Sequence, residues 1–398
     1  MSAVIHVVTA LERGGAQRNT LETAARLHDE GRPQLVVTGA PGDLDAEAQE
    51  RLGRRLVRLP ALTGPLDPVR DLLALDALAR LVRRQVARLG APVLVHTHSS
   101  KAGVLGRLAA RSVPGALVAH TVHGFGLQAL GHRRAWVLEA AERVAARAAD
   151  VMIFVSDGDR RLAEDMGLLR HARAETIRSG IEPAPFVALR GNAERRARAR
   201  GALGLPEGAP VALTVANLKP QKDPLFHADI LAAWRAHDPR ARLVFLGDGP
   251  LRGALEARVA ALGLRGAFVM PGFVADPLDA LAAADVFLLA SAWEGLPRSV
   301  LEATAAGLPA VVRDTGWAAD LSWARSVHAV PSGAPADAFA VRLRELVAKP
   351  PRPTRLRKEF TLDGMLDDLG RLYDELIGAP RYARGTVDAR PRGRARRR

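Results

Sequence analysis

The segment WEGLPRSVLE, residues 293–302, carries two carboxylates whose spacing suits one bound ligand. Glu294 follows an apolar run typical of a buried strand, whereas Glu302 falls on a helix whose first turn suits Pro297. Because one carboxylate is on a loop and the other on a helix, we do not expect an acid/base pair. We expect two separate hydrogen-bond acceptors, with Glu302 suited to a vicinal diol and Glu294 to other hydroxyl groups. The alternative is a capping glutamate and a solvated helix glutamate.

Two of the five lysines lie in ANLKPQKD, residues 216–223. The chain has 52 arginines, so a retained lysine is a weak indication of a site that needs a compact ammonium group. The segment lies where an apolar strand ends and a helix should begin, and a helix N-terminus attracts anions. We expect Lys222, with Lys219 as its helper, to bind a diphosphate. A solvated basic loop is the alternative.

A glycine pair in LERGGAQ, residues 11–17, joins the first apolar run to the first helical stretch. Gly14 and Gly15 permit backbone amides to approach a phosphate closely at the start of a helix. The pattern G-x-G-x-x-G is absent, so this is not a dinucleotide-binding fingerprint. An ordinary strand-to-helix turn is the alternative.

Two further turns follow apolar runs, GDGP at residues 247–250 and PGFV at residues 271–274. Backbone geometry is the main role expected of the first. For the second, we expect backbone amides near Val274 to meet the edge of a nucleotide base.

Histidines gather at the ends of two expected strands. In HTHSSKAG, residues 96–103, His96 and His98 share one face of a strand end, which is typical of metal ligands, but no third ligand is evident and we expect no metal. HTVHGFG, residues 120–126, places His123 just beyond the next strand and beside glycines. His123 is therefore either a structural histidine or a group that faces a bound substrate.

Short apolar runs alternate with longer helical stretches through the first 180 residues. This alternation predicts parallel strands joined by crossover helices. The expected strands are 3–9, 34–39, 92–98, 116–122 and 151–156, and the expected helices are 16–30, 71–89 and 135–148.

The alternation is interrupted over residues 182–210, where prolines, glycines and clustered arginines predict a linker. We predict an α/β fold of two doubly wound domains, with a cleft at the C-terminal ends of their strands. The expected domains are 1–182 and 183–354, and the strands expected in the second are 211–217, 242–247, 267–272, 285–290 and 309–314.

The composition of the 398 residues fits a folded protein that stays in the cytoplasm. Hydrophobic residues make up 48%, which is enough to bury a core. The absence of cysteine excludes disulfides, thiolate catalysis and zinc–thiolate sites. No signal peptide and no apolar run near the ~20 residues of a membrane span is evident, so we expect a cytoplasmic location.

The net charge of +14 is concentrated at the C-terminus. The last 18 residues hold eight arginines against Asp388 alone, which is half of the excess. We expect residues 380–398 to form a disordered basic tail, with adhesion to anionic lipid as the sharper alternative. Nucleic acid is disfavoured as a partner because stacking aromatics are nearly absent.

Taken together, these segments resemble the retaining glycosyltransferases of family 4, the group 1 glycosyl transferases, up to about residue 379. The most specific mark is E-x7-E, from Glu294 to Glu302, and HTHSSKAGVLGRLAAR and HTVHGFG look like bacterial members that build surface polysaccharides. The resemblance implies the GT-B architecture, with two Rossmann-like domains. It also implies metal-independent transfer without a cofactor, with retention of anomeric configuration. Residues 355–379 would hold a helix that crosses back to the first domain.

The resemblance also implies roles for single residues. Glu302 would hold the ribose, Lys222 the diphosphate and Gly15 a phosphate. His123 and Glu294 would be catalytic groups near the reacting sugar. The implied donor-binding set is Gly14, Gly15, Asn217, Lys219, Lys222, Val274, Leu296, Arg298 and Glu302, with His98 and Lys101 on the acceptor side.

Three positions depart from the family pattern. Asn217 stands where an arginine is frequent, five residues before Lys222, so we expect Lys219 to share the phosphate role. Trp317 stands where a second glycine is common, which would reshape the sugar pocket. The frequent N-G-I-D turn reads SGIE at residues 179–182.

The activity expected from these observations is transfer of a hexose or N-acetylhexosamine from a nucleotide-diphosphate sugar, with UDP favoured. The expected acceptor is a glycan or a polyprenyl-linked glycan, reached at the inner face of the cytoplasmic membrane. Two alternatives stay open here. One is a sugar-nucleotide epimerase, which needs no acceptor, and the other is a non-catalytic protein that binds an anionic polymer.

Overall fold

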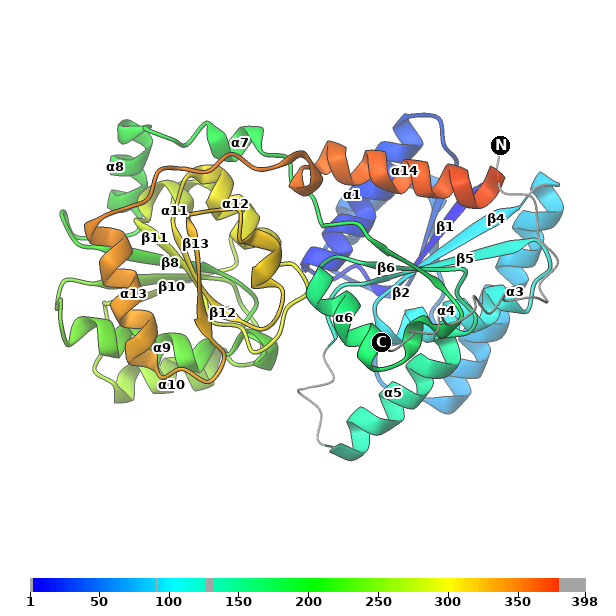
Figure 1. Ribbon diagram of the computed structural model, residues 1–398, viewed down its shortest axis with the longest axis horizontal. Coiled ribbons are helices and arrows are strands. Elements are labelled where there is room, and N and C mark those ends of the chain that lie inside the picture. The colour runs from blue at the N-terminus through cyan, green and yellow to red at the C-terminus, as the bar shows by residue number, and fades with distance from the viewer. Residues whose placement is uncertain (1–2, 91, 126–131, 379–398) are drawn as a thin grey trace, which may run out of the picture.

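The computed structural model describes residues 3–90, 92–125 and 132–378, which form two parallel β-sheets with helices on both faces. Figure 1 shows the two halves side by side, the earlier part of the chain in one and the later part in the other. The predicted α/β class with two doubly wound sheets is confirmed. The expected basic tail lies outside the described residues. No helix in the described part of the chain is both long and apolar enough to span a bilayer.

The first sheet has seven parallel strands in the order β3-β2-β1-β4-β5-β6-β7. Helices α1 and α2 pack on one face, and α3 and α4 pack on the other. Helix α5 continues this second layer beside α4. The strands are β1 (Val4–Ala10), β2 (Gln34–Ala40), β3 (Leu56–Arg58), β4 (Val93–His98), β5 (Ala116–Val122), β6 (Val151–Phe154) and β7 (Arg173–Thr176). The helices are α1 (Gly15–Asp29), α2 (Asp45–Leu52), α3 (Pro68–Leu89), α4 (Ser100–Arg111), α5 (His132–Ala146) and α6 (Asp157–Asp165).

The second sheet has six parallel strands in the order β10-β9-β8-β11-β12-β13. Helices α8, α11 and α12 cover one face, and α9, α10 and α13 cover the other. The strands are β8 (Val211–Val215), β9 (Arg242–Leu246), β10 (Phe268–Gly272), β11 (Val286–Leu289), β12 (Ala310–Asp314) and β13 (Val327–Pro331). The helices are α7 (Ala184–Val187), α8 (Ala193–Ala202), α9 (Pro224–Arg235), α10 (Arg252–Ala261), α11 (Leu278–Ala283), α12 (Arg298–Ala306), α13 (Ala336–Ala348) and α14 (Leu362–Gly378).

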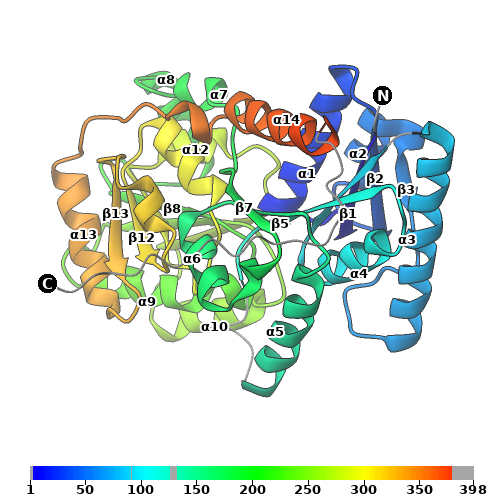
Figure 2. The same cartoon turned by 45° about the vertical axis from the view of Figure 1, so that its right-hand side comes forward.

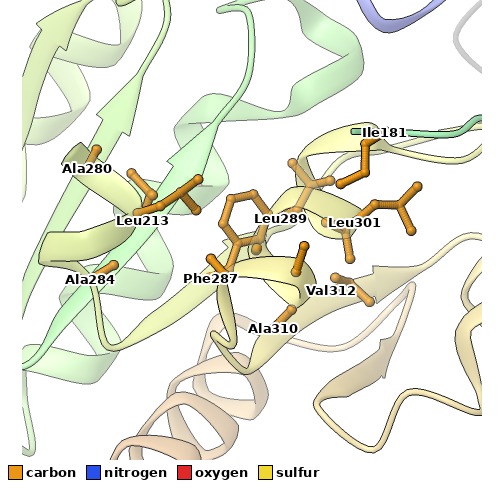
Figure 3. Packing of buried hydrophobic residues seen from close by; sticks show 14 of the residues in the cluster. Ile181, Leu213, Ala280, Ala284, Phe287, Leu289, Leu301, Ala310 and Val312 are labelled. Atoms are coloured by element: carbon orange, nitrogen blue, oxygen red, sulfur yellow. The ribbon is translucent and has the colours of Figure 1, made fainter. Parts of the chain in front are cut away.

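The core beneath α12 fixes the helix that carries Glu302. Figure 3 shows Leu301 of α12 lying against Leu289 of β11. Leu289 and Leu301 are almost fully buried. Because apolar burial contributes about 25 cal/mol per Å², this packing holds the helix firmly against its sheet.

The predicted linker over residues 182–210 is partly wrong. Residues Ala193–Ala202 form α8, which packs against α11 as part of the second half. The segment AERRARARGA has no apolar residue larger than alanine and buries only Ala199, so it shows no clear apolar stripe at the helical period. Three arginines of α8 anchor it instead, and Arg196 pairs with Asp285 at 2.6 Å.

Short edge strands and one helix boundary also differ from expectation. Strands β3, β7 and β13 were not predicted, because they are three to five residues long and carry polar side chains. Helix α3 begins at Pro68 rather than residue 71, since the Asp67 side chain accepts a hydrogen bond from the Arg70 amide at 3.1 Å.

The C-terminal helix α14 returns to the first sheet after the second sheet is complete. It lies beside α1 in Figures 1 and 2. Its apolar face joins a core cluster with Val4 and Leu94, from β1 and β4. Tyr373 of α14 is fully buried there, and its hydroxyl contacts His96 Nδ1 at 2.5 Å. The helix begins at Leu362, later than expected, after an irregular stretch from residue 350.

We expect Leu369→Ala to lower the free energy of unfolding by ~2–5 kcal/mol, because Leu369 is buried in the cluster between α14 and the first sheet. Urea unfolding measures this loss. Arg371→Ala, on the exposed face of the same helix, should change stability by less than ~0.5 kcal/mol. Equal losses in the two variants would show that α14 contributes no specific packing.

Candidate functional site

A cavity of about 410 Å³ lies where the C-terminal ends of the two sheets face each other. Both halves of the chain line it, as the predicted cleft requires. Two predicted positions, His98 and Lys101, are absent from its lining. The predicted residues that line it are Gly14, Gly15, His123, Asn217, Lys219, Lys222, Val274, Glu294, Leu296, Arg298 and Glu302.

The glycine pair stands at the start of α1. Gly14 is the N-cap with an extended backbone, and Gly15 is the first helical residue. A Cβ atom at Gly15 would lie 3.7 Å from Arg298 Cδ, an ordinary contact, so the protein alone does not require glycine there. The free amides of the helix N-terminus face the cavity, which suits an anion.

Lys222 is held at the end of a short 3-10 helix, Pro220–Lys222, just before α9. The next residue, Asp223, has a positive φ of 45° and pairs with Arg313 at 2.9 Å, which fixes this unusual turn. Lys222 Nζ donates to Glu294 Oε1. The two side chains that were assigned separately to diphosphate and to sugar are therefore direct neighbours.

Contacts also cross the cavity from one half to the other. Lys219 pairs with Glu12 at 2.9 Å. The Asn217 side-chain amide donates to the Arg13 carbonyl at 2.7 Å. Lys219 and Asn217 thus bind the loop before Gly14 in this conformation, so an arriving ligand must share or displace these bonds.

Arg298 joins α12 to α1 through a bidentate ion pair with Glu22, at 2.8 and 3.1 Å. One turn later, Glu302 lines the cavity, and its carboxylate makes no hydrogen bond to any residue in the described part of the chain. Burial raises the pKa of Glu302, against the opposing effect of the nearby Arg298 charge. An acceptor without a protein partner beside a cavity suits a ligand that brings hydroxyl donors.

His123 follows β5 and lines the cavity, next to a close contact between the two halves. Gly124 has a positive φ of 111°, and a Cβ there would lie 2.8 Å from the Gly295 amide nitrogen, so a side chain does not fit. Burial lowers the pKa of His123 to about 4. The ring is therefore neutral near pH 7, and it can accept or donate a hydrogen bond without charge.

The loop after β10 supplies the apolar end of the cavity. Phe273 and Val274 are 42% and 40% exposed, unusually so for such side chains. The Arg13 guanidinium lies 3.5 Å from the centre of the Phe273 ring. Leu296 is buried beneath the cavity. A flat exposed ring and free backbone at this place suit a planar base.

Lys101 lies outside the cavity, where it pairs with Asp71 at 2.6 Å and donates to the Pro65 carbonyl. Lys101 does not line the cavity, so its predicted place on the side of the acceptor substrate has no support from a cavity contact. His98 is buried behind His123, with its Nδ1 atom 3.2 Å from His123 Nε2.

Several residues around the site were not predicted from the sequence. Glu12, Arg13 and Phe273 line the cavity, and Glu22 holds Arg298. Glu12 and Arg13 directly precede the glycine pair, and this position was the sequence signal that could have identified them as site residues. His6 was missed as a third histidine, because it lies 90 residues before His96 and only β1–β4 pairing brings the two together.

Two family profiles match the chain. The one described as glycosyl transferases group 1 matches residues 195–361, and the one described as glycosyl transferase 4-like domain matches residues 14–180. A 2-deoxystreptamine N-acetyl-D-glucosaminyltransferase of Streptomyces fradiae is 31% identical over 323 residues, 74% of this chain and 73% of that protein. The UDP-Gal:alpha-D-GlcNAc-diphosphoundecaprenol alpha-1,3-galactosyltransferase of Escherichia coli is 28% identical over 313 residues, 78% of each chain.

The fold also matches solved structures. The crystal structure of Anabaena Alr3699/HepE in complex with UDP superposes with a TM-score of 0.74 at 18% identity, covering 94% of this chain and all of that one. At this identity the match concerns the fold alone.

Proposed function

The chain belongs to the group 1 glycosyl transferases, and from this premise we propose that it moves a hexose or N-acetylhexosamine from a UDP-sugar to a lipid-linked glycan, with retention of configuration. The family assignment makes the chain a glycosyltransferase and favours neither epimerisation nor passive binding of a polymer. The E. coli relative that uses UDP-Gal supports UDP as the carrier. The undecaprenol in that relative's name supports a polyprenyl-linked acceptor.

One observation carries the proposal: Lys222, Glu294 and Glu302 meet in a single cavity between the two sheets. Glu302 accepts the ribose hydroxyls, as its unpartnered carboxylate suggests. Lys222 and the amides at the start of α1 bind the diphosphate. Glu294, beside Lys222, then contacts the sugar at the point where the phosphate is attached.

The reaction follows from this placement of charge. The acceptor hydroxyl oxygen forms a bond to the anomeric carbon of the sugar as the bond between that carbon and the diphosphate breaks. Negative charge grows on the departing phosphate oxygen, which takes up the proton that the acceptor hydroxyl releases. Lys222 stabilises that charge, as do the amides at Gly14 and Gly15, so we propose that transfer needs neither a metal ion nor a cofactor. His123 provides a neutral polar group near the sugar.

The principal test is a comparison of UDP, GDP and ADP by thermal shift. A bound nucleotide stabilises the folded state by RT ln(1 + [L]/Kd), so UDP at 100-fold its Kd adds about 2.7 kcal/mol. We expect UDP to raise the melting temperature most. Transfer of labelled sugar to a polyprenyl-diphosphate glycan completes the test. Consumption of the donor without an acceptor, or no stabilisation by any of the three, would contradict the proposal.

An apolar patch supports a peripheral contact with the membrane. Leu66, Val69 and Leu72, at the start of α3, are 79%, 69% and 69% exposed. Lys101, in the first turn of α4, bonds to the carbonyl of Pro65, which places the patch at the C-terminal ends of the strands. This is the end of the sheet where the cavity lies. Exposed apolar side chains grouped on one surface are typical of an interaction site.

Replacing both Val69 and Leu72 with aspartate should lower binding to anionic vesicles by about ten-fold or more. Two exposed apolar side chains that would insert into the lipid are then exchanged for charges. Co-sedimentation measures the binding, and activity on a short water-soluble acceptor should persist. The control is Val341→Asp, at an exposed site on α13. Equal vesicle binding by the two proteins would remove the patch from the proposal.

A further inference from the structure

Three buried polar side chains form a line that ends at the part-buried His123. Gln34 Oε1 lies 2.8 Å from His6 Nε2. His6 Nδ1 lies 3.2 Å from His98 Nε2, and His98 Nδ1 lies 3.2 Å from His123 Nε2. Gln34, His6 and His98 are at most 4% exposed, so the line runs from the sheet interior to the cavity.

Gln34 gives this line a direction. Its amide group donates to the Arg32 carbonyl at 3.3 Å, so its Oε1 is the end that accepts from His6. Burial lowers the pKa of His6 to about 4 and that of His98 well below its ordinary value, so both rings are neutral. A neutral imidazole has one N–H donor and one acceptor nitrogen.

The proton positions then follow one after another. With Nε2–H directed at Gln34, His6 Nδ1 must accept, so His98 carries its proton on Nε2. His98 Nδ1 in turn accepts from His123, which carries its proton on Nε2 as well. His123 Nδ1 is left as an acceptor, and it has no hydrogen-bond partner in the described part of the chain.

We propose that Gln34, His6 and His98 are positioning residues that hold His123 as the Nε2–H tautomer, so that Nδ1 accepts a hydrogen bond from a hydroxyl group in the cavity. The identity of that hydroxyl, on the donor sugar or on the acceptor, rests on the proposed function. The tautomer does not, and it can be measured without a substrate.

A metal ion is the competing use of these histidines, because His6, His96 and His98 have nitrogens within 4.8 Å of one another. His96, however, contacts the Tyr373 hydroxyl at 2.5 Å and the Thr121 hydroxyl at 2.7 Å. Both of its nitrogens are thereby occupied by the protein. The contacts favour a network of hydrogen bonds over a metal centre.

The direct test is nitrogen NMR of the full chain labelled with ¹⁵N-histidine, with His123 assigned by its loss in His123→Gln. We expect Nδ1 of His123 to resonate as an unprotonated, pyridine-type nitrogen and Nε2 as a protonated one at neutral pH. The opposite assignment overturns the proposal. So does a stoichiometric metal ion in the purified protein that, when removed with a chelator, shifts the His98 resonances.

Two substitutions at Gln34 extend the test to activity. Gln34→Met keeps the length of the side chain but removes the acceptor, so both tautomers of His123 should be populated. The kcat should fall in proportion to the lost Nε2–H fraction, by about two-fold for an equal mixture. Gln34→Glu keeps the acceptor but raises the pKa of His6 from about 4 toward its ordinary ~6.5. Among the described residues, the titratable groups around His6 are the rings of His96 and His98, with Tyr373 beyond His96.

The kcat of the glutamate variant, taken relative to that of the wild type at the same pH, should therefore depend on pH. At about pH 8.5, His6 is neutral and the original order is kept, so activity should lie within about two-fold of the wild type. At about pH 5.5, His6 becomes imidazolium and donates from Nδ1, which reverses the line and places a proton on His123 Nδ1. NMR should show that reversal, and kcat relative to wild type should fall.

The matched control is Thr38→Val on the same strand, β2. The Thr38 hydroxyl is buried and makes no hydrogen bond to a described residue, so its loss perturbs the core without touching the line. We expect wild-type activity and an unchanged tautomer. The proposal would be contradicted by a wild-type kcat in Gln34→Met. It would also be contradicted if the kcat of Gln34→Glu relative to that of the wild type did not change with pH. If neither the wild type nor any variant transfers sugar but the tautomers change as described, the proposed function fails and the positioning role stands.

Discussion

Lys222→Ala is expected to lower kcat for sugar transfer by about 100- to 1,000-fold, because it removes the cation beside the departing phosphate. The side chain is 20% exposed and emerges from a turn that the Asp223–Arg313 ion pair holds in place. Its loss should therefore leave the backbone unchanged. Initial rates at saturating donor measure the effect, and the melting temperature reports the fold.

The substitution has a second consequence that must be separated from the first. Lys222 also neutralises Glu294, whose side chain is 7% exposed, and a buried carboxylate without a partner is costly. The double variant Lys222→Ala/Glu294→Gln removes that cost. If Lys222 acts on the phosphate, the double variant is slower than Glu294→Gln alone. Equal rates in the double variant and in Glu294→Gln would mean that Lys222 serves only its carboxylate.

Lys358→Ala is the matched control for this pair of experiments. Lys358 is 76% exposed and pairs with Asp367, away from the cavity. An exposed pair of this kind contributes little to stability, so both stability and transfer should stay near wild type. A comparable loss of activity here would show that the assay responds to net charge and not to the site.

Three basic residues of the cavity lining are engaged by acids of the protein itself. Lys222 pairs with Glu294, Lys219 with Glu12 and Arg298 with Glu22. Two of these pairs cross from one half of the chain to the other. We expect a diphosphate that enters to take over Lys222, which frees Glu294 within the second half of the chain. Where it also takes over Lys219, the contact between Lys219 and Glu12 across the cavity is lost.

Much of the fold could be predicted because most of its strands contain a continuous apolar run. Residues 116–122 were predicted as a strand and form one, since Val118 and Ala119 are buried on opposite faces of the sheet. Helix α8 was missed for the opposite reason: its contacts are made by arginines to carbonyl groups, and the sequence shows no apolar period.

The site was predictable where its residues are close in sequence and sit at the ends of strands. Glu294 and Glu302 mark one segment, and Gly14 with Gly15 marks another. The local pattern was enough to place each segment just after the C-terminal end of a strand. Pairs such as Glu22–Arg298 join residues more than 270 positions apart, and either partner alone reads as a surface charge. The contact between His6 and His98 likewise could not be predicted from the sequence, because the two residues are far apart along the chain.

Glu302→Ala should weaken UDP binding by about 10- to 100-fold, because a carboxylate that accepts from a ribose diol contributes ~1.5–3 kcal/mol. Calorimetric titration measures the affinity. The same variant should unfold with an unchanged or larger free energy at pH 8. Burial raises the pKa of Glu302 in the folded state, so the ionised form opposes folding once the pH rises through that value. Weaker binding without lost stability distinguishes a ligand contact from a structural one.

The raised pKa also gives UDP binding a pH dependence with a definite sign. As the pH falls through the folded-state pKa of Glu302, the carboxyl group takes up a proton and loses acceptor capacity, so UDP should bind more weakly on the acid side. Glu302→Gln cannot titrate, and its UDP affinity should be low and flat over the same range. Glu359→Gln, at an exposed residue outside the cavity, should follow the wild-type curve. A pH dependence that persists in Glu302→Gln would assign the titration to another group and remove Glu302 from the ribose.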